Sequence, residues 1–203
     1  MLSMQFDDYL RLGIAAGLFA FQIFLWKSEV SEKKRKCIFK ILFFGAIAAV
    51  FGYCLYISIT QYSVWADGFY SYLPPTVNPL NHFIPYILIH YWATFLISLI
   101  LGVLGFYSAN YANKKYGERF FEPEEPFLIL TAIFLTGHPA WIAFVILLLL
   151  AALLFSVLNS IKRRGERFSL YWLWLPLAFF TIIISSWLFV NFQWLSVLKL
   201  GTI

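Results

Sequence analysis

The chain alternates between long apolar runs and short polar turns. The apolar runs cover residues 12–26, 38–60, 83–107, 127–158 and 169–190. A helix needs about 20 apolar residues to cross a bilayer core of about 30 Å. Four of the runs fit one crossing each, the first if its helix begins near Tyr9. The run 127–158 is too long for one crossing, and Thr136-Gly137-His138-Pro139 interrupts it.

The basic residues decide how this interrupted run folds. Lys and Arg gather in three turns, at residues 27–40, 114–119 and 162–167. Such clusters favour the cytoplasmic side of a membrane. A single crossing by residues 127–158 would place the third cluster outside, whereas a helical hairpin that turns at Gly137-His138-Pro139 keeps all three inside. The pattern therefore predicts an all-α, polytopic helical membrane protein with about six transmembrane helices and both termini outside.

The composition agrees with a membrane protein. Hydrophobic residues make up 62% of the chain and charged residues 12%, whereas soluble domains usually carry about 25% charged residues. This excludes a disordered chain, an ordinary cytosolic enzyme and a nucleic-acid-binding domain, so no nucleic acid is expected as a partner. We expect residues 1–203 to form a single transmembrane domain in a bacterial inner membrane, with membrane lipids and other membrane protein subunits as partners.

Candidate chemistry centres on Asp67, the only formally charged residue between Ile41 and Asn113. A lone acid among aromatic residues at a membrane surface is a candidate functional group. The alternative interpretation is an Asp-Gly turn in which Gly68 takes a positive φ. His82, His90 and His138 are predicted on the same side, so they and Asp67 could bind a divalent metal or perform acid–base chemistry. Their spacing matches no specific ligand signature.

The segment around Asp67, ADGFYSYLPP, resembles the first outer loop of bacterial GT-C membrane glycosyltransferases. The resemblance implies sugar transfer from a polyprenyl-phosphate donor at the outer membrane face, often with a divalent cation. It makes Asp67 the catalytic acid, and His138 a second catalytic group from the next outer loop. The residues it implies for substrate binding are Trp65, Phe69, Tyr70, Tyr72 and His82.

A weaker resemblance points to a degenerate prepilin peptidase. Asp67 and Pro74 have the spacing of that family, Glu125 would replace its second acid, and Gly137-His138-Pro139 and Pro176 fall at suitable distances. The family's GxGD motif is absent. One predicted span separates Asp67 from Glu125, and acids on opposite faces of a bilayer cannot act on one peptide bond. This resemblance therefore implies an inactive relative.

A third interpretation is a non-catalytic membrane subunit or assembly partner. Small residues in the second span, namely Gly45, Ala46, Ala48, Ala49 and Gly52, are predicted to form one face for close helix packing. A transporter or channel is disfavoured because no predicted span carries a buried charge. The acidic segment 118–125 is expected to be a solvated cytoplasmic loop, and Pro176 is expected to kink the last span.

Overall fold

The computed structural model describes residues 6–28, 30–68, 80–117, 121–161, 170–191 and 198. Every regular element in these residues is helical. Among them, four helical segments are long and apolar enough to cross a membrane, and two shorter apolar helices accompany them. The elements are α1 (Phe6–Lys27), α2 (Glu32–Asp67), α3 (Leu80–Ile87), the π-helix η2 (Leu88–Trp92), α4 (Ala93–Lys115), α5 (Glu125–Thr136), α6 (Ala140–Ile161), the 3₁₀ helix η3 (Leu170–Trp172) and α7 (Trp174–Asn191). The all-α prediction is confirmed.

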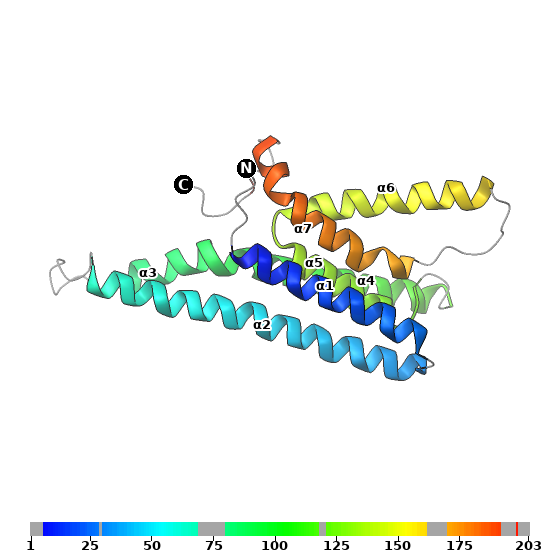
Figure 1. Ribbon diagram of the computed structural model, residues 1–203, viewed down its shortest axis with the longest axis horizontal. Helices are drawn as coiled ribbons and strands as arrows, with labels where there is room; N and C mark the ends of the chain where they lie inside the picture. Colours follow the sequence, from blue (N-terminus) through cyan, green and yellow to red (C-terminus); the bar gives the residue numbers. More distant parts are fainter. Residues whose placement is uncertain are drawn as a thin grey trace.

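The predicted helical hairpin is also confirmed. α5 ends at Thr136, α6 begins at Ala140, and the chain reverses its direction between them (Figure 1). The ends of α1, α4 and α6 consequently point to the same side of the molecule, which we call the basic end because Lys27 and Lys115 lie there. The opposite side, where α2 ends at Asp67, is called the far end. The basic residues at 162–167 lie outside the described residues.

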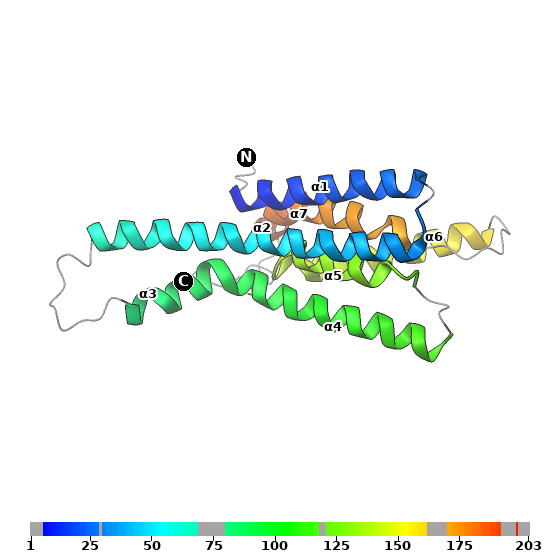
Figure 2. The same cartoon turned by 90° about the horizontal axis from the view of Figure 1, so that it is seen from below.

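The short helix α5 forms the centre of the bundle. Eleven of its 12 residues are buried, from Glu125 to Thr136 with Phe127 as the exception. α4 packs closely against it at two glycines (Figure 2). A Cβ on Gly102 would lie 2.9 Å from Leu130 Cδ1, and one on Gly105 would lie 3.1 Å from Ile129 Cγ2. The missing side chains at these glycines therefore let the two helices approach.

The structure extends α2 and the α3–η2–α4 segment well past the predicted spans. Each covers 36 residues, or about 54 Å, against a bilayer core of about 30 Å. The rings of Phe6 and Tyr53 lie 5.3 Å apart, so α1 begins beside residue 53 of α2. Residues 54–67 of α2 continue beyond that point toward the far end, opposite α3 (Figures 1 and 2). Asp67 is thus the last residue of a helix and not part of a loop.

Two prolines affect the helices differently. Pro85 lies inside α3, where it cannot donate a backbone hydrogen bond, and the π-helix Leu88–Trp92 follows one turn later. The chain bends between α3 and α4 (Figure 2). Pro176 lies in the first turn of α7, which begins at Trp174. The N–H groups of a first turn have no acceptor within the helix, so a proline there removes no helical hydrogen bond. The kink predicted at Pro176 is therefore wrong.

Candidate functional site

The predicted aromatic site lies at the far end, between α2 and α3. The Trp65 ring packs 5.4 Å from that of Phe83 and 4.9 Å from that of Tyr86, which stacks on His90 at 4.2 Å. Asp67 is exposed at the end of α2, and His82 is exposed on α3. Gly68 has φ −103°, so the predicted positive-φ turn is wrong. Phe69, Tyr70 and Tyr72 lie outside the described residues.

His138 is placed elsewhere. Its backbone N–H donates to the carbonyl of Thr94 at 3.2 Å, beside Trp92, whose ring stacks on Phe51 at 5.4 Å. Asp67 lies 16 residues beyond Phe51 on the same helix, a rise of about 24 Å. The structure therefore separates the two side chains that the GT-C resemblance makes catalytic.

Both ring nitrogens of His138 are also engaged. Trp141 Nε1–H donates to His138 Nδ1 at 3.2 Å, and His138 Nε2 lies 2.9 Å from the carbonyl oxygen of Leu198. This pattern fits a neutral imidazole that accepts at Nδ1 and donates at Nε2. The imidazole holds the hairpin turn in place instead of presenting a free base.

The described residues form no cluster of metal-ligating side chains. Within the described ranges, no three side chains of His, Cys, Asp or Glu lie close enough to share a metal ion. Asp67 and Glu125 lie at opposite ends of the bundle, which also keeps the two acids of the peptidase resemblance apart.

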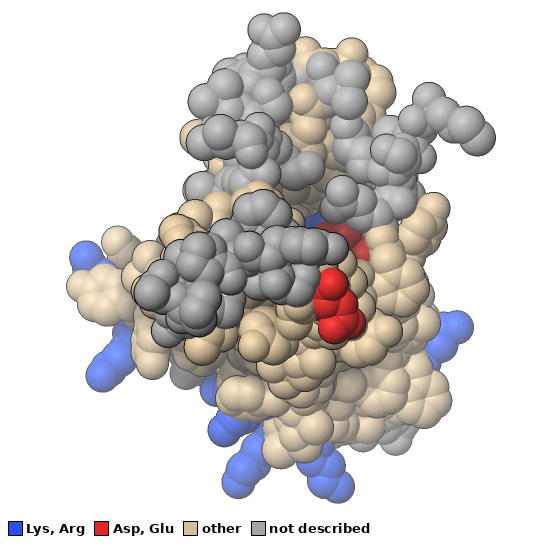
Figure 3. All heavy atoms as spheres, turned by 90° about the vertical axis from the view of Figure 1, so that its left-hand side faces the viewer, with Lys and Arg blue, Asp and Glu red and all other residues tan. Residues whose placement is uncertain are grey.

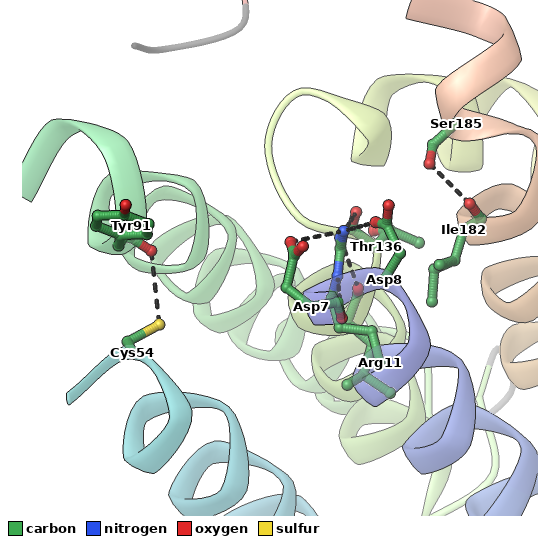
Figure 4. Close-up of polar contacts among 9 residues, drawn as sticks. Asp7, Asp8, Arg11, Cys54, Tyr91, Thr136, Ile182 and Ser185 are labelled. Carbon is green, nitrogen blue, oxygen red and sulfur yellow. Dashed lines mark hydrogen bonds and ion pairs between the residues drawn. The ribbon is translucent and has the colours of Figure 1, made fainter. Parts of the chain in front are cut away.

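A buried ionic network lies where α5 ends, and we call Asp7, Asp8 and Arg11 the Arg11 cluster. Arg11 donates through Nη1 to the carbonyls of Leu135 at 3.4 Å and Thr136 at 3.0 Å, and through Nη2 to the carboxylates of Asp7 at 3.4 Å and Asp8 (Figure 4). Its Nε donates to the backbone carbonyl of Asp7 at 3.3 Å. A guanidinium with all these acceptors is well compensated for its burial.

The position of Arg11 follows from helix chemistry. The last carbonyls of a helix lack partners and carry partial negative charge, so a cation stabilises them. Gly137 gives it room, since a Cβ there would lie 2.8 Å from Arg11 Nη1, and φ is 73° with ψ 162°. Arg11 and Asp8 are only 7% and 8% exposed. The prediction that no span carries a buried charge is therefore wrong.

Asp7, Asp8 and Arg11 were missed, although the sequence carries a signal for them. Aspartates three and four residues before an arginine share one face of a helix. At the start of an apolar run, such a set indicates an ionic network inside the bundle.

A second buried polar group lies at the basic end, and we call Gln22, Arg35, Glu124, Tyr171 and Trp174 the Glu124 cluster. Arg35 Nε is 3.2 Å from Glu124 Oε1, within ion-pair distance but not aligned for a hydrogen bond. Gln22 Nε2–H donates to the backbone carbonyl of Tyr171 at 2.7 Å. Among the described residues, Glu124 Oε2, Gln22 Oε1 and Trp174 Nε1 are buried without a hydrogen-bond partner.

The last two residues of the acidic segment are not solvated, contrary to the prediction for 118–125. The residues Glu124 and Glu125 are 0% and 1% exposed. Burial raises the pKa of the Glu124 carboxyl. The Arg35 guanidinium and the backbone N–H of Glu124 lower it, and the nearby Glu122 and Glu32 raise it; the net shift is upward. The surface at the far end has few basic side chains near its centre, because Lys and Arg lie mainly round the rim of the described surface in this view (Figure 3).

Comparison with known proteins gave no relative for this chain. No family model matches it, and no curated protein or solved structure matches it either.

Proposed function

We propose that this protein is a non-catalytic subunit of a bacterial inner-membrane assembly and that α2 packs against a transmembrane helix of its partner. The observation that carries the proposal is a row of small residues on the outside of α2. Gly45, Ala48, Ala49 and Gly52 are exposed, and a Cβ on either glycine would meet no atom within 4 Å. Ala46 is buried in the bundle and is not part of this row.

Transmembrane helices associate where small residues let their backbones approach closely. The four exposed residues repeat every three or four positions, so they form one stripe along the helix. Gly102 and Gly105 of α4 serve the same purpose inside the bundle, where α5 covers them. On α2 no described helix covers the stripe, which supports a helix from outside the chain as its occupant.

The exposed apolar side chains of α2 at the far end also support the proposal. Beyond the start of α1, α2 exposes apolar and aromatic side chains, including Tyr56 at 66%, Ile59 at 63% and Val64 at 61%. A continuous helix of about 54 Å such as α2 cannot be covered by a core of about 30 Å unless it tilts strongly. If the basic end faces the cytoplasm, this uncovered part stands at the outer face, where an apolar partner would shield it.

A photo-crosslinking residue placed at Ala49, in the full chain in its native membrane, tests the proposal. We expect a discrete protein adduct of constant mass, and we expect Gly45→Leu or Gly52→Leu to abolish it by filling the stripe. Ser108, exposed on α4, is the matched control position and should give lipid adducts. Lipid adducts alone at Ala49, or an adduct that survives both leucine substitutions, would refute this function.

A GT-C-like transferase is the second candidate, favoured by the exposure of Asp67 beside the rings of Trp65, Phe83 and Tyr86. In this proposal Asp67 assists transfer of a sugar from a polyprenyl phosphate, and Trp65 and His82 bind the donor. The test is sugar transfer in proteoliposomes that hold the full chain. Asp67→Asn should abolish transfer, whereas Asn81→Asp on α3 should leave it unchanged. Equal transfer by wild type and Asp67→Asn would eliminate this role.

A further inference from the structure

Glu124 is a fully buried carboxyl group whose partners among the described residues are few. Its side chain is 0% exposed, and its ion pair with Arg35 Nε, at 3.2 Å, lacks hydrogen-bond alignment. Its second oxygen has no hydrogen-bond partner among the described residues. A carboxylate taken out of water needs several donors, because an unpaired buried charge costs several kcal/mol. The observed surroundings therefore fit the ionised form poorly.

The groups that influence Glu124 and its neighbour Tyr171 come from α1, α2, η3 and the segment before α5. α2 contributes Arg35 and Glu32, and the segment before α5 contributes Glu122; all three shift the pKa of Glu124. Tyr171 of η3, whose pKa is raised by burial, lies close enough for the charge of Glu124 to raise that pKa further, and Gln22 of α1 interacts with Tyr171. Gln22 Oε1 is a fully buried acceptor with no hydrogen-bond partner among the described residues. Together with Glu124 Oε2, it is an acceptor at the basic end whose burial is not compensated by a hydrogen bond from a described residue.

We propose that Glu124 is a proton-binding site at the basic end of the bundle, in which the carboxyl exchanges its ion pair with Arg35 for a proton. The proton adds to a carboxylate oxygen and forms an O–H bond, and Glu124 becomes neutral. Arg35 keeps its charge and, with its side chain 15% exposed, turns toward water or lipid phosphate. The site rests on the Glu124 cluster alone and is independent of the docking surface on α2.

Proton binding would act on how α2 is attached to the bundle. The Arg35–Glu124 pair joins the first turn of α2 to the residue that precedes α5. Loss of the pair on protonation removes the ionic tie at this end while the aromatic contacts of Phe43 and Phe51 with Phe134 remain. The proton thus changes the contact at the basic end of α2 and leaves the packing of its middle unchanged.

Carbodiimide labelling of the full chain in proteoliposomes tests the proposal, because dicyclohexylcarbodiimide reacts with protonated carboxyls in apolar surroundings. Peptide mapping should show Glu124 labelled several-fold faster than the more exposed Glu122, with a rate that falls as pH rises. Arg35→Gln should move the pH curve upward, and Arg35→Lys should keep it near the wild-type position. Labelling of Glu124 no faster than that of Glu122, or a curve unmoved by Arg35→Gln, would overturn the proposal.

Infrared spectra give a second readout that does not depend on the arginine variants. The wild-type protein should show a carboxylic-acid C=O band that appears as the pH is lowered, and the near-isosteric Glu124→Gln variant should lack it. If the bands of the two proteins are identical, Glu124 does not bind the proton. The two spectra would be identical, for example, if a buried water kept Glu124 ionised at every pH.

Discussion

The two ends of α5 carry ionic groups in the order that the helix dipole favours, yet they differ in how completely those groups are paired. Arg11 meets the carbonyl end of the helix, and Glu124 precedes its amino end. Each donor nitrogen of Arg11 has at least one acceptor from Asp7, Asp8, Leu135 or Thr136. The Glu124 cluster leaves buried acceptors and a donor without hydrogen bonds among the described residues.

This difference indicates what each cluster does. A fully satisfied buried network fixes one arrangement of the chain and gains nothing from a ligand. An incompletely satisfied network is costly and is retained where a proton, water or ligand completes it. The Arg11 cluster therefore terminates a helix inside the bundle, and the Glu124 cluster is the one for which we propose proton binding.

The largest effect is expected from Arg11→Leu. It leaves two aspartates and the last carbonyls of α5 buried without their cation, which costs about 3–5 kcal/mol in comparable buried pairs. Thermal unfolding in detergent should show a large drop in stability. Arg11→Lys, which keeps the charge but loses the forked geometry, should fall between the two proteins. A wild-type melting curve for Arg11→Leu would show that the cluster is dispensable.

The next largest loss of stability is expected when glycines with positive φ are replaced by alanine, and two such glycines can be compared. Gly137→Ala places a methyl group 2.8 Å from Arg11 Nη1 in a backbone conformation almost restricted to glycine. Gly117→Ala, at φ 68°, meets nothing within 4 Å and pays only the backbone cost of about 1 kcal/mol. The melting temperature should fall clearly further for Gly137→Ala. Equal losses would mean that Arg11 yields to the methyl group without cost.

A smaller effect on stability, with a distinct pH signature, is expected from Glu124→Gln. Because the pKa of Glu124 is raised above its ordinary value of 4.5 in the folded protein, the folded state binds this proton more tightly than the unfolded state. The stabilisation of the folded state by this proton is complete below about pH 4.5 and is lost as pH rises through the folded-state pKa of Glu124. Melting temperatures should show this decline in the wild type and a flatter profile in Glu124→Gln. Parallel profiles would contradict it.

The smallest contrast lies within the Arg11 cluster itself. The Asp8 side chain is 12% exposed, whereas that of Asp7 is 30% exposed and meets Arg11 at 3.4 Å. Partly exposed ion pairs contribute about 0–1 kcal/mol. Asp8→Asn should therefore lower the melting temperature more than Asp7→Asn does, and the reverse order would mean that burial does not decide the strength of these pairs.

The sequence by itself determined the helical class, the hairpin at Gly137-His138-Pro139 and the common side of Lys27 and Lys115. These follow from hydrophobic run length and from the position of Lys and Arg, which are local properties of the chain. The length of α2 was underestimated, because a helix continues past its apolar run wherever a neighbour such as α3 packs against it.

Only the tertiary structure decided which polar groups are buried and which of them meet. Arg11 and Leu135 are 124 positions apart in sequence, and Gln22 and Tyr171 are 149 apart, so no local pattern reveals these contacts. The same holds for the separation of Asp67 from His138, which the rise along α2 sets. Burial depends on which helices surround α5, and that arrangement exists only after the whole chain has packed.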